Sequence, residues 1–209
     1  MIPTSKIAVV RIGLPELYLV KYMAHRACLN GSSSVRFDEG DREENLYDDN
    51  LVGQANTLAL HYYLFKQKLM AEDVYNYSRL LANMNPTQSD GGQDVLDSDI
   101  DMKGSMIREW YKKKDPNDMR CSVREYHDNW IYVFGFVSNY AAEQHYNKEK
   151  EIIVKILGWL KSEDLPPPST EPGKWNGARY LWGRDIRPLP IPKNLYPSIF
   201  SQQLLKHLK

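Results

Sequence analysis

Apolar residues recur at helical spacing along one long stretch in the first half of the chain. Between residues 51 and 69 the spacing alternates between four and three residues, which places one stripe on one face of a helix. The stripe consists of Leu51, Ala55, Leu58, Tyr62, Phe65 and Leu69, and it resumes with Val74, Tyr77, Leu81 and Met84 before Pro86. This pattern predicts an amphipathic helix followed by a second helix or a kinked continuation.

Further segments predict helices that bury the same core. Residues 14–31 carry proline in the first turn and end on glycine, which is typical of a helix. Residues 130–141 fit helical spacing, although the run "WIYVFGFV" within them also suits a buried strand, and helix is favoured. Residues 153–160 continue the helical pattern. The sequence therefore predicts a mainly α protein with a single helical-bundle-like domain.

Proline changes the character of the chain after residue 164. Eight of the twelve prolines lie between Pro166 and Pro197, and such a run favours an extended connection. We therefore assign residues 1–164 to the helical globular domain and residues 165–209 to an extended C-terminal arm that ends in a short helix capped by Ser198. Deletion of the arm is expected to leave a folded helical core.

Charge and composition restrict the partners and the compartment. The 209 residues include 27 basic and 27 acidic side chains, so no overall field attracts nucleic acid or an anionic membrane. The chain has no run of roughly 18 apolar residues and no signal-peptide pattern, and its two distant cysteines are a poor disulfide framework. We expect the cytoplasm or another intracellular reducing compartment, or a virion, and no membrane partner.

An acidic run over residues 87–101 begins like a calcium-binding loop, but its later residues do not match that motif. Asp97, Asp99 and Asp101 alternate as the first ligands of a calcium loop do. Met102, however, stands where the loop needs glycine, and Arg108 stands where it needs a carboxylate. The run therefore favours an acidic, solvated loop whose aspartates are replaceable without loss of folding.

Histidine and cysteine carry weaker chemical signals. His25 and Cys28, with Cys121 and His127, supply zinc-type ligands without the usual tight spacing. Arg120 and His127 are separated as in some RNA-cleaving helical domains, but only loosely, and the chain has no phosphate-binding loop, nucleophile elbow or HExxH helix. The sequence thus assigns no cofactor, no metal and no catalytic residue, and it favours a non-enzymatic protein.

Basic and aromatic residues intermingle in the predicted arm, which makes it the candidate binding element. The candidate binding residues are Trp175, Arg179, Tyr180, Trp182, Arg184, Arg187, Phe200 and Leu204. Aromatic and arginine side chains are common interface anchors, and proline lowers the entropic cost of ordering an extended ligand. The favoured hypothesis is a structural or adaptor subunit that assembles through the arm, with itself, a larger protein complex or a viral particle.

Two other hypotheses remain. In the first alternative, the arm binds nucleic acid, with its aromatic rings stacked on bases and its cations on phosphates. A metal-dependent or RNA-cleaving enzyme stands third.

Overall fold

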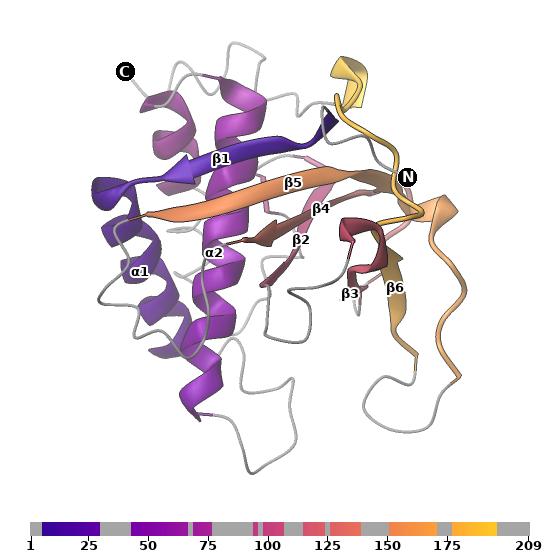
Figure 1. Cartoon of the computed structure of the whole chain (residues 1–209), viewed down its shortest axis with the longest axis horizontal. Coiled ribbons are helices and arrows are strands. Elements are labelled where there is room, and N and C mark those ends of the chain that lie inside the picture. Colours follow the sequence, from indigo (N-terminus) through magenta and orange to yellow (C-terminus); the bar gives the residue numbers. More distant parts are fainter. Residues whose placement is uncertain are drawn as a thin grey trace.

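Four strands form the central sheet of the protein. The computed structural model describes residues 6–29, 43–66, 69–76, 94–95, 98–106, 115–123, 126–138, 151–170 and 177–195. The strands β1 (Ala8–Ile12), β2 (Ile100–Met106), β4 (Ile131–Val137) and β5 (Ile152–Lys161) lie in the order β1–β5–β4–β2 (Figure 1). β5 is antiparallel to β1 and β4, whereas β2 is parallel to β4. The protein is therefore mixed α/β, and the prediction of a mainly α, helical-bundle-like domain is wrong.

Strands β4 and β5 occupy two segments that the sequence predicts as helices. All seven residues of β4 are buried, with Tyr132 and Phe134 in one hydrophobic cluster and Ile131 and Val133 in another. A strand that is buried on both faces has no polar face, so its sequence lacks the alternation that identifies a half-exposed strand. Its unbroken apolar run therefore also matches helical spacing.

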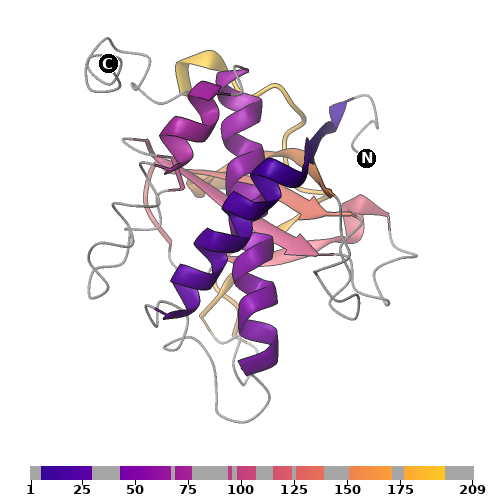
Figure 2. The same ribbon diagram turned by 90° about the vertical axis from the view of Figure 1, so that its left-hand side faces the viewer.

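Two helices cover one face of the sheet. α1 (Leu14–Leu29) and α2 (Glu43–Phe65) pack against each other, and α2 also contacts all four strands (Figure 2). Both helices confirm the sequence prediction. α2 ends where Lys66 adopts a φ of 56°. Residues 69–76 are helical again, which agrees with the predicted second helix or kinked continuation. The predicted continuation beyond residue 76 lies outside the described residues.

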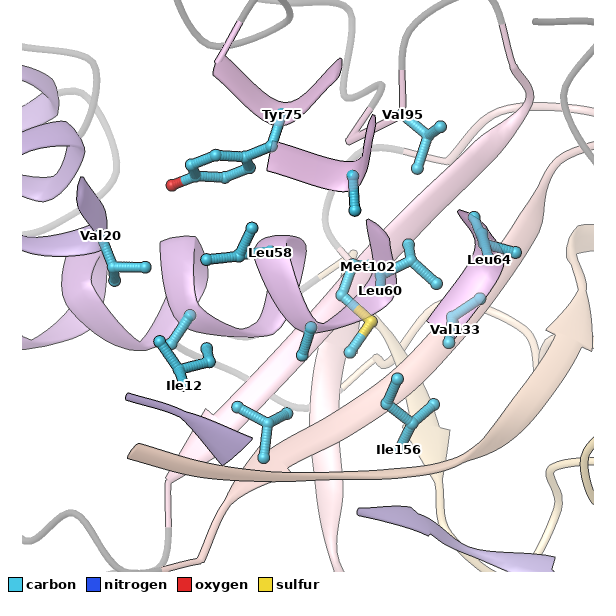
Figure 3. Close-up of a cluster of buried hydrophobic side chains, with 14 of the residues drawn as sticks. Ile12, Val20, Leu58, Leu60, Leu64, Tyr75, Val95, Met102, Val133 and Ile156 are labelled. Carbon is cyan, nitrogen blue, oxygen red and sulfur yellow. The ribbon is translucent and has the colours of Figure 1, made fainter. Parts of the chain in front are cut away.

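The core between the helices and the sheet is the larger of two hydrophobic clusters, and we call it the helix-side cluster. In Figure 3, Leu60 of α2 lies beside Met102 of β2, and Leu64 of α2 lies beside Val133 of β4. No helix among the described ranges is both long enough and apolar enough to cross a membrane.

A two-stranded ribbon covers the opposite face of the sheet. Its strands, β3 (Arg120–Val123) and β6 (Arg179–Trp182), are antiparallel. Between the ribbon and the sheet lies a second cluster, the ribbon-side cluster, which consists of Met119, Val123, Tyr132, Phe134, Phe136, Leu157, Leu160, Leu165, Leu181 and Ile186. The central sheet is thus covered on both faces.

Residues 165–170 and 177–195, which the sequence places in an extended arm, contribute to both clusters. Leu165, Leu181 and Ile186 are buried in the ribbon-side cluster, and Leu189 and Ile191 in the helix-side cluster. In the described residues this segment is therefore packed into the core and is not extended away from it. The predicted terminal helix after Ser198 lies outside the described residues.

Main-chain pairing also joins this segment to the sheet. The Trp159 N–H donates to the Arg187 carbonyl at 3.0 Å, and the Arg187 N–H donates to the Trp159 carbonyl at 2.7 Å. A Cβ atom at the neighbouring Gly158 would lie 2.2 Å from the Arg187 carbonyl oxygen. Glycine at position 158 is thus required for the chain to approach β5 this closely.

Candidate active site

Strand β2 carries two charged residues on the ribbon side of the sheet. Side chains alternate along a strand, and Ile100 and Met102 lie in the helix-side cluster. Asp101 and Lys103 therefore point to the opposite face, where the Lys103 ammonium lies 6.0 Å from the centre of the Tyr132 ring. Asp101 is only 2% exposed. The predicted solvated loop is therefore wrong at Asp101, which belongs to a strand and is buried.

A second carboxylate, Asp94, is fixed beside this strand by three hydrogen bonds. The Thr57 hydroxyl donates to Asp94 Oδ1 at 2.9 Å, and the Met102 N–H donates to Asp94 Oδ2 at 2.8 Å. The Asp94 N–H donates to the Ile100 carbonyl at 3.3 Å. Asp94 lies close enough to Asp101 for its negative charge to disfavour ionisation of the Asp101 carboxyl. The two carboxyl groups therefore form a pair.

The Lys103 amine completes the group. Lys103 Nζ lies 2.6 Å from Asp101 Oδ2, and the Lys103 side chain keeps 22% of its surface exposed. Despite this short distance, Asp101 Oδ2 accepts no hydrogen bond of normal geometry among the described residues. The contact is thus an ion pair rather than a directed hydrogen bond. We call Asp94, Asp101 and Lys103 the acid–lysine site.

Burial and charge act on both members of the ion pair. Burial raises the pKa of Asp101 well above its ordinary value, and Asp94 adds to the effect, while Lys103 opposes it. Burial alone lowers the pKa of Lys103, but the attraction of Asp101 outweighs burial and leaves the lysine pKa raised.

Helix α2 positions the acid–lysine site through a close approach to the sheet. Gly104 of β2 and Gly135 of β4 are register partners, and a Cβ atom at either would lie within 2.7 Å of the Asn56 amide. The Asn56 side chain donates to the Val52 carbonyl at 2.8 Å. The glycine pair thus makes room for Asn56, and the next residue, Thr57, then reaches Asp94.

Tyr132 of β4 and Cys121 of β3 lie beside the site, and the loop before β4 contacts Tyr132. The Tyr132 hydroxyl accepts a hydrogen bond from the His127 N–H at 3.0 Å, and the His127 ring stacks on Trp130 at 4.0 Å. Cys121 of β3 interacts electrostatically with Lys103, but burial raises the pKa of its thiol to about 12. Cys121 is therefore a poor nucleophile at neutral pH.

Asp94 and Asp101 are the two carboxylates that the acid–lysine site offers to a hard divalent cation, and both Asp94 oxygens also accept hydrogen bonds from Thr57 and Met102. Among the described residues, no group of three or more histidine, cysteine, aspartate or glutamate side chains is placed to hold a metal ion. A cation at Asp94 and Asp101 therefore needs further oxygen ligands from the main chain, water or a substrate. Mg²⁺ is commonly bound in this way, through one or two carboxylates together with substrate phosphates.

The structure divides the binding residues predicted from the sequence into two groups. Arg179 donates to the Pro166 carbonyl at 2.8 Å and lies 4.3 Å from the Tyr126 ring centre. Arg187 pairs with Asp164 and lies 5.1 Å from the Trp159 ring centre. Both arginines thus hold parts of the fold together.

The second group lies on the ribbon, where Tyr180 and Trp182 of β6 and the following Arg184 stand near Arg120 of β3. Trp175, Phe200 and Leu204 lie outside the described residues.

Sequence reasoning missed Asp94, Asp101 and Lys103 as a site. The available signal was the alternation of apolar and charged residues in Ile100-Asp101-Met102-Lys103, which is typical of a strand with one polar face. The abundance of aspartate before this run directed the interpretation to a loop instead.

Comparisons of the chain with protein-family models, with curated proteins and with solved structures found no match.

Proposed function

We propose that the protein is a divalent-cation-dependent phosphodiesterase that hydrolyses nucleic acid at the acid–lysine site. The observation that supports this most is the 2.6 Å contact between Lys103 Nζ and Asp101 Oδ2, beside Asp94, on a strand of the central sheet. Two carboxylates and an amine combine a cation site with a fixed positive charge. A bound metal ion and a cationic side chain each stabilise the negative charge that develops in phosphoryl transfer.

Each side chain has a distinct role in this proposal. Asp94 and Asp101 would hold the cation, and Thr57 together with the Met102 N–H orients Asp94. In the structure the Lys103 ammonium faces Asp101 Oδ2. Lys103 would interact with a phosphate oxygen of the substrate and stabilise the negative charge that develops there.

The proposed reaction is a hydrolysis that needs no further reactant. A water oxygen forms a bond to phosphorus, and the bond between phosphorus and one sugar oxygen breaks. The attacking water loses a proton to solvent, and the departing oxygen takes one from solvent. A bound divalent cation supplies Lewis acidity and lowers the pKa of a coordinated water.

The test is cleavage of labelled DNA and RNA, single- and double-stranded, by the full chain with Mg²⁺ or Mn²⁺. We expect cleavage that EDTA abolishes and that Asp101→Asn and Lys103→Met each reduce by about 100-fold or more. Asp99→Asn is the matched control, because Asp99 is a neighbouring acidic residue with an exposed side chain, and this variant should keep full activity.

Cation binding separates the two roles. In titrations with Mn²⁺, Asp101→Asn should weaken binding, whereas Lys103→Met should retain it because lysine is not a ligand. The proposal fails if the wild-type protein cleaves none of the substrates with either cation. It also fails if Asp101→Asn, folded by circular dichroism, cleaves as fast as the wild type.

The assembly function that the sequence favoured stays a prediction, because no described contact tests it. The nucleic-acid alternative is compatible with the proposed activity.

A further inference from the structure

The ribbon presents a polar outer face. Its register pairs Arg120 with Trp182 and Ser122 with Tyr180. Val123 and Leu181 are buried in the ribbon-side cluster. Because side chains alternate along each strand, the paired Arg120, Ser122, Tyr180 and Trp182 lie on the face away from the ribbon-side cluster. Arg120 is exposed there, whereas Ser122, Tyr180 and Trp182 are half-buried and the Tyr180 hydroxyl is buried.

Two arginines stack on the aromatic rings of this outer face. The Arg120 guanidinium lies 4.8 Å from the centre of the Tyr180 ring and 5.3 Å from that of Trp182. The Arg184 guanidinium lies 4.4 Å from the centre of the Trp182 ring. Stacking holds a guanidinium plane in place while its N–H edge stays available to a bidentate anion such as phosphate. The two arginines are thus preorganised donors.

Neither arginine is committed to a close ion pair within the described residues. Arg120 is exposed and has no carboxylate partner there. Arg184 Nε lies 4.0 Å from Asp185 Oδ1, at the limit of an ion pair, and more than half of its side chain is exposed. Arg179 and Arg187 differ, because each is held by an acceptor in the fold.

The ribbon also lies beside the catalytic strand. β3 contacts β2 (Figure 1), and Cys121, between Arg120 and Ser122, interacts electrostatically with Lys103. Cys121 alternates with Arg120 and Ser122, so it faces inward and the acid–lysine site lies on the inner side of the ribbon. A nucleic-acid backbone bound on the outer face therefore has to pass the edge of the ribbon to reach this site.

We propose that Arg120 and Arg184, stacked on Tyr180 and Trp182, form a clamp for the sugar–phosphate backbone of the nucleic acid that the acid–lysine site cleaves. This inference rests on the proposed function. The aromatic rings serve to orient the guanidinium groups, so the clamp binds phosphates and does not read bases. Recognition at the clamp is consequently independent of sequence.

The test measures binding apart from cleavage. Full-length protein carrying Asp101→Asn is titrated into a fluorescently labelled single-stranded DNA of mixed sequence, without divalent cations, over a range of salt concentrations. Adding Arg120→Gln or Arg184→Gln should weaken binding by roughly tenfold each, because each removes a charge-assisted contact. The slope of log K against log salt should fall by about 0.7 for each phosphate that the variant no longer neutralises.

Two further variants act as controls. Lys193→Gln removes an exposed cation outside the ribbon and should leave affinity and slope nearly unchanged. Arg120→Lys keeps the charge but not the planar stacking, so its affinity should lie between that of the parent protein and that of Arg120→Gln. Melting temperatures within about 2 °C of the parent's exclude unfolding as the cause.

The outcomes distinguish the clamp from the catalytic proposal. If the wild-type protein cleaves nucleic acid but the Arg120→Gln, Arg184→Gln double variant keeps its affinity and salt slope, the clamp is wrong and the proposed function stands. If the double variant loses affinity while the wild type fails to cleave, the clamp stands without the enzyme. Equal reductions of affinity in Lys193→Gln and Arg120→Gln also overturn the clamp, because they indicate diffuse charge attraction.

Discussion

Replacing Ile191 or Leu181 by alanine tests whether the C-terminal segment belongs to the same folding unit as the helices and the sheet. Ile191 is 1% exposed and Leu181 is 0% exposed, and they lie in different clusters on opposite faces of the sheet. Each substitution removes buried methyl groups and leaves a cavity, at a cost of about 2–5 kcal/mol of unfolding free energy. The total stability of a domain is only about 5–15 kcal/mol, so either loss should be conspicuous.

Thermal unfolding followed by circular dichroism measures this loss. In a chain of this size, 1 kcal/mol shifts the Tm by roughly 2–4 °C, so each variant should melt about 4–20 °C below the wild type. Lys193→Ala is the control, since Lys193 is an exposed side chain two residues from Ile191, and it should change stability by less than about 0.5 kcal/mol. Ile191→Ala and Leu181→Ala variants that melt with the control would refute the packing described above.

Truncation removes several such side chains at once. Deleting residues 165–209 takes away five buried aliphatic side chains, Leu165, Leu181, Ile186, Leu189 and Ile191. At about 1.5–3 kcal/mol each on full burial, their combined contribution is comparable to the whole stability of a domain. We therefore expect the truncated chain to lose cooperative unfolding and near-ultraviolet circular dichroism, which reverses the expectation drawn from the sequence. A cooperative melt of the truncated chain would contradict this.

Two further predictions concern packing and thiol chemistry. Gly104→Ala should destabilise the protein by about 1–3 kcal/mol in urea unfolding, because its Cβ would lie 2.5 Å from Asn56 Nδ2; combining it with Asn56→Ala should recover part of the loss. By contrast, Gly53→Ala has open space around its Cβ and should gain about 0.5–1 kcal/mol from helix propensity. Burial raises the pKa of the Cys121 and Cys28 thiols. In iodoacetamide labelling at pH 8, both should therefore react much more slowly in the folded protein than in protein unfolded by guanidinium. Equal rates in the two states would show that neither thiol is protected.

α1 was predictable because its signals are local: proline stands in its first turn, and its buried residues recur at helical spacing. α2 was found from its stripe of apolar residues, although the structure buries every residue from Ala55 to His61, including the polar Asn56 and Thr57. β4 and β5 were mistaken because their partners cover both faces. The apolar run from Ile131 to Val137 is consistent with either structure until the neighbouring strands are known.

The C-terminal segment shows a different limit of the sequence. Proline excludes regular helix and central strand, and the irregular path around Leu189 and Ile191 agrees with that exclusion. It does not follow that such a chain lies outside the core. Isolated apolar side chains between prolines fill space on two faces of the sheet, and only tertiary contacts such as the pairing of Trp159 with Arg187 reveal where they go.

The candidate site was only partly visible for the same reason. Asp101 and Lys103 are two residues apart, so a strand places them on one face, and this much was available locally. Asp94 joins them through Thr57 of a helix that is 37 residues distant in sequence. That contact depends on the glycine pair that admits Asn56, which is a property of the folded sheet.

The energetics of β2 also favour a chemical role for its charges. Burying a carboxylate and an ammonium costs more hydration energy than their attraction usually returns, and apolar residues of similar volume are often at least as stable. β2 nevertheless places Asp101 at 2% exposure, directly over a cluster of apolar and aromatic side chains. The same pair supplies what the proposed site needs, a carboxylate for a cation and a positive charge for a phosphate. The cost of the pair to stability is thus itself a reason to place the chemistry at Asp101 and Lys103.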